Sequence, residues 1–244
     1  MEREIEDPLH HFVLHPIIPL HVLGFDVSIN KAVVFMWIVC GTVMALFYVA
    51  TKGRMMVPTR LQSLVEMAVE FLRDMVLSTM GEKGLKLLPF LAALFFFILF
   101  CNLFGLIPGS YTVTSQAAVT GLFAMVVYVL SVIVGLYYHG VHYFSLFTPP
   151  GTPRWLIPAM IPIEIISQLA RPFTLALRLF INMTVGHMMI AVFLGLAMWS
   201  AYALVPLVGV AVLLYGLELF IALIQAYIFT ILACVYIGEA IHLH

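Results

Sequence analysis

The sequence predicts an all-α, polytopic membrane protein with about five membrane crossings, one interfacial amphipathic helix and two long, tilted C-terminal helices. Hydrophobic residues make up 64% of the 244 residues and charged residues only 9%, whereas water-soluble domains usually carry about 25% charged residues. The apolar residues form uninterrupted runs that are long enough to cross a bilayer as helices. One further segment alternates apolar and charged residues with the period of a helix that lies at a membrane surface.

We expect a single membrane domain that covers residues 1–244 and opens with an extramembrane segment at 1–30, where prolines interrupt any helix. The expected elements that follow are a first span at 31–51, an amphipathic helix at 57–80, spans at 87–108 and 117–138, and long helices at 155–199 and 203–241 that form an ion path. The segment 155–199 is about twice as long as a simple span. It is therefore either one long tilted helix or two spans.

The basic residues predict the orientation of the chain in the membrane. They gather in two loops that alternate crossings place on one side, namely at Lys52, Arg54, Arg60, Arg73, Lys83, Lys86 and Arg154. Loops rich in Lys and Arg stay in the cytoplasm. The pattern therefore predicts an N-terminus outside and a cytoplasmic C-terminus.

Polar residues inside the long helix 155–199 share one face. At 100° per residue they fall within an arc of about 80°, and they are Glu164, Gln168, Arg171, Arg178 and Asn182. Ionisable groups at this depth are costly and usually pair, face water or carry ions. The spacing thus indicates a hydrated path along one side of the helix.

The last helix repeats this pattern over an arc of about 120°. Its polar residues are Tyr215, Glu218, Gln225, Tyr236 and Glu239. Two helices with polar stripes bury those stripes at the lowest free-energy cost when the stripes face each other or a common partner. Arginine keeps its proton at any accessible pH, so an arginine within such a track is a fixed positive barrier.

Each of these residues also has a simpler structural interpretation. Arg178 could form an ion pair with Glu164 or with Glu218. Glu164 and Arg171 could pair with groups on neighbouring helices, and Gln225 and Asn182 could merely join helices by hydrogen bonds. His187 could be a hydrogen-bonded packing residue.

Other chemistry is absent from the sequence. No phosphate-binding loop, dinucleotide motif, zinc-protease motif or nucleophile elbow is present. The N-terminal histidines lack the spacing of metal ligands, and a net charge of −1 gives no reason to expect nucleic acid. We therefore expect no metal, no cofactor and no catalytic reaction in this chain. A secondary transporter would be expected to show an inverted repeat, and a membrane enzyme a nucleophile with its base; neither pattern is found.

Residues 164–187 read Glu-Ile-Ile-Ser-Gln-Leu-Ala-Arg-Pro-Phe-Thr-Leu-Ala-Leu-Arg-Leu-Phe-Ile-Asn-Met-Thr-Val-Gly-His. This segment resembles the signature of the F-type ATP synthase a subunit family. Residues 104–108, 112–114 and 223–229 resemble further segments of that family. The resemblance covers nearly the whole chain and is weakest over residues 1–30.

The resemblance implies that Arg178 faces the rotating ring of c subunits and separates two proton half-channels. It implies a place in the proton path for Asn182, Gln225 and Glu164, and a His/Glu pair formed by His187 and Glu218. The helical spacing by itself adds supporting positions in the same polar track, namely Gln168, Arg171, Tyr215, Tyr236 and Glu239.

The function that the resemblance implies is that of a non-catalytic stator subunit, which couples proton flow to ring rotation and ATP synthesis. The implied partners are the c-ring, subunit b of the peripheral stalk near helix 57–80, the remainder of the complex and the lipid bilayer. The implied location is an energy-coupling membrane such as the bacterial inner membrane. Coupling to sodium in place of protons stays open, because the ion specificity depends largely on the c-ring and not on this chain.

Overall fold

The chain forms long α-helices, and the predicted polytopic all-α fold is confirmed. The computed structural model describes residues 16–18, 21–22, 25–26, 29–52, 59–107, 113–140, 143, 156–199 and 204–242. The helices are α1 (Lys31–Lys52), α2 (Arg60–Met80), α3 (Leu88–Gly105), α4 (Ala117–His139), α5 (Ile157–Trp199) and α6 (Leu204–Ile241), with 3-10 turns η2 (Glu82–Leu87) and η3 (Val113–Ser115). Within these described residues, five helices are long and apolar enough to cross a membrane: α1, α3 together with η2, α4, α5 and α6.

The N-terminal segment contains two short antiparallel strand pairs. Strand β1 (Pro16–Ile18) pairs with β4 (Ile29–Asn30), and β2 (His21–Val22) pairs with β3 (Phe25–Asp26). The sequence did not predict these strands, because two or three residues are too few to show an alternating pattern.

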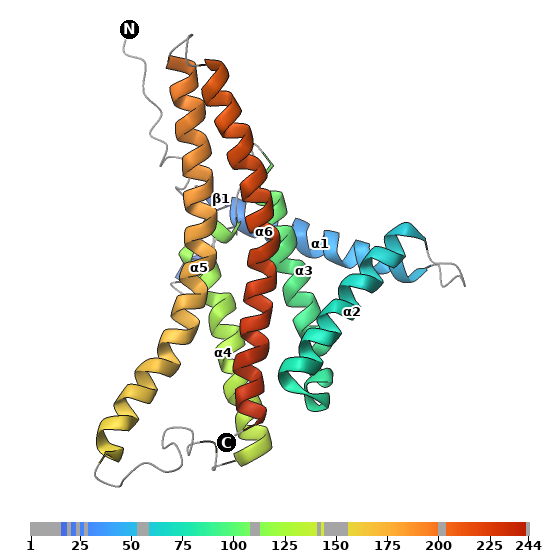
Figure 1. Cartoon of the computed structure of the whole chain (residues 1–244), viewed down its shortest axis with the longest axis vertical. Helices are drawn as coiled ribbons and strands as arrows, with labels where there is room; N and C mark the ends of the chain where they lie inside the picture. Colours follow the sequence, from blue (N-terminus) through green and yellow to red (C-terminus); the bar gives the residue numbers. More distant parts are fainter. Residues whose placement is uncertain are drawn as a thin grey trace.

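Helices α5 and α6 form an antiparallel hairpin that runs the length of the molecule (Figure 1). The 43 residues of α5 make one continuous helix, which decides between the two alternatives for this segment. At 1.5 Å per residue it is about 65 Å long, roughly twice the hydrocarbon thickness of a bilayer. A helix of this length that crosses once must therefore be strongly tilted.

The direction of α1 agrees with such a tilt. This helix has 22 residues, the length of an ordinary span, and it lies across the long axis of the hairpin (Figure 1). Toward its N-terminal end α5 bends away from α6 (Figure 1). Pro162 and Pro172 lie in this half of the helix, where each removes a backbone hydrogen bond and favours bending.

The core lies where α6 packs against α2, α3, α4 and α5. Its largest fully buried side chains include Leu91, Ile98, Leu175, Leu179 and Phe229. These come from α3, α5 and α6, so the same packing that excludes lipid also fixes α5 and α6 against each other.

Helix α2 begins after Thr59, whose side-chain oxygen accepts a hydrogen bond from the Gln62 backbone N–H at 3.3 Å. Only part of its predicted apolar stripe faces the core. Leu72 is buried, whereas Leu64 and Phe71 are 62% and 51% exposed. The apolar surface of α2 is thus wider than its contact with the bundle, and the remainder suits lipid or a partner helix.

Candidate functional site

The polar stripes of α5 and α6 meet at the hairpin interface in three successive contacts. Because the helices are antiparallel, residue numbers rise along α5 as they fall along α6. The contacts are Arg171 with Glu239, Asn182 with Gln225, and Gly186 with Glu218. The helical periodicity that the sequence shows on each helix therefore brings the polar residues of α5 and α6 to one shared interface.

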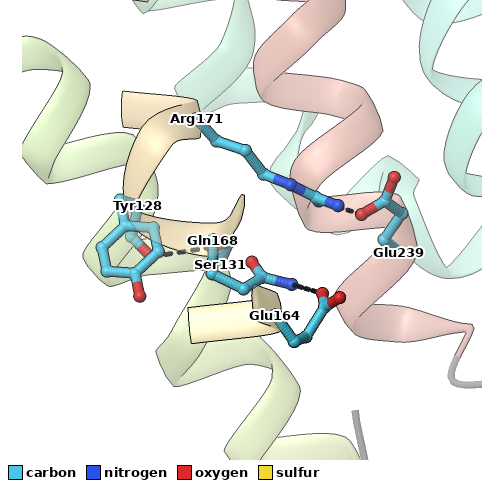
Figure 2. Close-up of polar contacts among 6 residues, drawn as sticks. All are labelled: Tyr128, Ser131, Glu164, Gln168, Arg171 and Glu239. Carbon is cyan, nitrogen blue, oxygen red and sulfur yellow. Dashed lines mark hydrogen bonds and ion pairs between the residues drawn. The ribbon is translucent and has the colours of Figure 1, made fainter. Parts of the chain in front are cut away.

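The first group of contacts, which we call the carboxylate cluster, consists of Glu164, Gln168, Arg171, Tyr236 and Glu239. Arg171 forms an ion pair with Glu239, and its guanidinium lies 5.4 Å from the centre of the Tyr236 ring. Gln168 Nε2 donates a hydrogen bond to Glu164 Oε1 at 3.1 Å (Figure 2). Two carboxylates, one held by a cation and one by a neutral amide, thus share one end of the hairpin.

A small cavity adjoins the carboxylate cluster on its α4 side. It is lined by Gln168, Arg171, Tyr236 and Glu239 together with Tyr128, Ser131, Tyr143 and Ala240. The Tyr143 ring packs against α4, since a Cβ atom at Gly135 would lie only 2.2 Å from it. Hydroxyl groups and carboxylates around one cavity can hold water and pass protons along hydrogen bonds.

The second group, which we call the amide cluster, consists of Asn182, Gly186, Glu218 and Gln225. Asn182 Nδ2 donates a hydrogen bond to Gln225 Oε1 at 2.8 Å, and Gln225 is 1% exposed. Glu218 is 3% exposed, and its Oε1 lies 2.6 Å from where a Cβ atom at Gly186 would be. A side chain at position 186 would therefore displace this buried carboxyl group from its present position.

Arg178 lies between the two clusters on α5 and its side chain is exposed. It follows Arg171 by seven residues and precedes Asn182 by four, which places it about 10 Å and about 6 Å from them along the helix axis. Within the residues that the structure describes, Arg178 forms no ion pair. The pair with Glu164 or Glu218 that the sequence left open is thus not formed there.

Two predicted residues are placed differently from the rest. Tyr215 donates its hydroxyl proton to the Leu106 carbonyl at 2.9 Å, so it joins α6 to α3. The side chain of His187 lies outside the described residues, and with it the predicted His187–Glu218 pair.

The structure adds polar residues that sequence reasoning missed. Tyr128, Ser131 and Tyr143 line the cavity beside the carboxylate cluster, but isolated hydroxyls in apolar segments form no recognisable pattern. Asn102 is fully buried, and its Nδ2 donates to the Ala222 carbonyl at 3.4 Å. An amide within the apolar span 87–108 was a signal that could have identified this residue.

Comparison with known proteins identifies the family of the chain. Residues 33–238 match the family described as ATP synthase A chain. An ATP synthase subunit a from Magnetococcus marinus is 42% identical, with 98% of this chain and 94% of the relative covered. The subunit a of Rhodospirillum rubrum is 41% identical, with 98% and 100% covered, and that of Acidiphilium cryptum is 46% identical, with 83% and 84% covered.

The chain belongs to the ATP synthase A chain family. The predicted family resemblance is therefore confirmed. Membership places the chain in the membrane-embedded Fo sector of an ATP synthase, where it serves ATP synthesis and hydrogen ion transport. The match begins at residue 33 and ends at residue 238, so it contains α5 and α6 up to Gly238 and omits the N-terminal strand pairs.

Proposed function

We propose that this chain is the stator subunit that provides two proton half-channels and presents Arg178 to the c-ring of a rotary ATP synthase. The observation that carries the proposal is the exposed Arg178, which lies between two polar clusters on the hairpin. An arginine at the centre of a membrane helix costs about 2.5–3.5 kcal/mol. Its exposure to a bilayer calls for an anionic partner outside the chain.

The surface around Arg178 fits such a partner. Ile181 and Val185 lie on the same face of α5, and they are 47% and 50% exposed. A fixed cation within an apolar surface suits an apolar ring that carries one ionised carboxylate at the same depth. The carboxylate of a c subunit has this chemistry.

The amide cluster is the proposed uptake half-channel. Glu218 and His187 would receive a proton from the outer aqueous phase, and Asn182 and Gln225 would pass it on toward the ring. Glu218 supports this role because it is a buried carboxyl group, and buried ionisable groups inside a membrane usually serve ion transfer.

The carboxylate cluster is the proposed release half-channel. Glu164 and Gln168 would accept the proton that leaves the ring, and the cavity beside Tyr236 and Glu239 would hold water on the way out. Arg178 lies between the clusters, and its guanidinium group keeps its proton and its positive charge at any accessible pH. A proton therefore cannot pass directly from one cluster to the other along α5; it must bind a carboxylate of the ring and move with it.

The two proposed half-channels and Arg178 together give the following sequence of proton-transfer steps. A proton from the uptake half-channel neutralises a c-subunit carboxylate, and the neutral carboxyl group can then rotate into lipid. After nearly a full turn another protonated carboxyl group reaches the release half-channel and loses its proton. One charge crossing 100 mV supplies about 2.3 kcal/mol, so several protons are needed for each ATP.

The remaining assignments follow from the same proposal. This chain performs no covalent catalysis and needs no cofactor. The exposed apolar side of α2, at Leu64 and Phe71, would meet subunit b of the peripheral stalk. The C-terminus would be cytoplasmic and the N-terminus outside, in a bacterial inner membrane.

A cross-linking experiment tests the proposed ring contact. A photoreactive residue in place of Ile181, on the Arg178 face, should capture the c subunit in membranes that hold the whole complex. The matched control is Leu169, which is 61% exposed but points about 180° away from Arg178, and it should not. Equal capture from both positions, or capture from Leu169 alone, would overturn the assignment of this face.

A further inference from the structure

The last turn of α6 is held in place by two other helices. Gly238 packs against the end of α2, where a Cβ atom would lie 3.0 Å from the Thr79 carbonyl oxygen. The His242 ring Nε2 lies 3.1 Å from the Met80 carbonyl oxygen. From the other side, His139 Nε2 lies 3.0 Å from the Ile241 carbonyl oxygen. Since a carbonyl oxygen only accepts, each ring nitrogen is the donor.

These hydrogen bonds use groups that would otherwise lack partners. The last carbonyls of an α-helix have no intrahelical donor, and Met80 and Ile241 are the final residues of α2 and α6. Histidine side chains near helix C-termini satisfy such carbonyls and interact favourably with the helix dipole. The C-terminal ends of α2, α4 and α6 are therefore joined at one place.

The joined turn also carries Glu239 of the carboxylate cluster. Consecutive helical residues point about 100° apart, so Gly238 faces α2 while Glu239 reaches α5 and pairs with Arg171. Glu239 and Gly238 therefore lie on one helical turn, with α2 on one side and Arg171 on the other. The other polar groups around Glu239 line the same cavity: Gln168, Tyr236, Tyr128, Ser131 and Tyr143.

We propose that Gly238 and His242 are positioning residues, through which the amphipathic helix α2 fixes Glu239 opposite Arg171 in the proton-release cluster. The proposal rests on the proposed function, because that function gives the carboxylate cluster its part in proton release. It assigns to α2 a direct effect on the proton path in addition to contact with other subunits.

The test compares variants of the whole complex in inverted membrane vesicles, whose outer face is the proposed release side. Gly238→Val forces a side chain against the Thr79 carbonyl, and His242→Ala removes a donor without adding bulk. His242→Gln keeps an N–H donor and serves as the conservative control. Gly209→Val is the control for the glycine change, since Gly209 lies on α6 with open space around its Cα.

The readout is the dependence of ATP-driven proton pumping on external pH, measured for assembled complexes only. We expect Gly238→Val and His242→Ala to shift this profile in the direction that Glu239→Gln shifts it. Combining either with Glu239→Gln should then add no further shift. His242→Gln and Gly209→Val should keep the wild-type profile.

Three results would overturn the inference. They are an unshifted profile in Gly238→Val and His242→Ala, a shift that adds fully to that of Glu239→Gln, or an unshifted profile in Glu239→Gln itself. Failure of the underlying function is distinguished by Arg178→Ala in the same vesicles. If that variant pumps normally, the proposed function fails; if it does not pump and the shifts are additive, only the positioning role is wrong.

Discussion

Replacing Gly186 with alanine should impair proton transfer without weakening the fold. The new Cβ atom would lie 2.6 Å from Glu218 Oε1 and 2.9 Å from its Cδ, whereas ordinary contacts begin near 3.4 Å. The carboxyl group must therefore retreat by roughly 1 Å, and a displacement of that size at a reacting group can cost about 100-fold in rate. Because alanine favours the helix over glycine by about 0.5–1 kcal/mol, the stability of α5 itself should not fall.

The assay is ATP-driven proton pumping in membrane vesicles, normalised to the amount of assembled complex. We expect Gly186→Ala to pump about 10- to 100-fold more slowly than the wild type. Gly195→Ala is the matched control on the same helix, since nothing lies within 4 Å of its added Cβ atom, and it should pump normally. Shortening the acid in a Gly186→Ala, Glu218→Asp double variant should restore part of the rate. Equal pumping by the two alanine variants would refute the role given to the buried carboxyl group.

Two further predictions concern the contacts between α5 and α6. Arg171→Gln leaves Glu239 without its cation in a membrane-spanning helix, so it should reduce pumping more than the double variant Arg171→Gln, Glu239→Gln, in which no charge is left unpaired; a double variant that pumps no better than the single one would count against this pairing. Asn182→Leu removes the donor to the buried Gln225 amide, so it should destabilise the subunit by about 1–3 kcal/mol and lower the thermal stability of the purified complex, and an unchanged melting temperature would contradict the buried hydrogen bond.

The sequence predicted those features of the site that repeat with the helical period. Apolar runs predicted the spans, and the spacing of Glu164, Arg171 and Arg178 placed them on one face of a helix. The partners across the interface were not predictable, because the register of two antiparallel helices depends on packing along their whole length. Pairing of Arg171 with a neighbouring helix was one alternative that the sequence left open, but its partner, Glu239, could not be named.

Residues without a periodic pattern were beyond sequence reasoning. Ser131 and Tyr143 reach the cavity because α4 packs beside α5 and the Tyr143 ring rests on Gly135. A lone hydroxyl in an apolar segment gives no sign of which neighbour it faces. How much of the apolar stripe of α2 packs on the bundle was not predictable either, since periodicity shows which side chains share a face but not how much of that face is covered.

The most direct test of the central claim is ATP-driven proton pumping in vesicles that carry Arg178→Ala, with assembly of the complex measured in parallel. Arg73→Ala, at an exposed arginine on α2, serves as the control for loss of a positive charge. If Arg178 is the charge that meets the ring between two half-channels, its alanine variant should assemble and fail to pump, while Arg73→Ala assembles and pumps. An assembled Arg178→Ala complex that pumps at the wild-type rate would contradict the account.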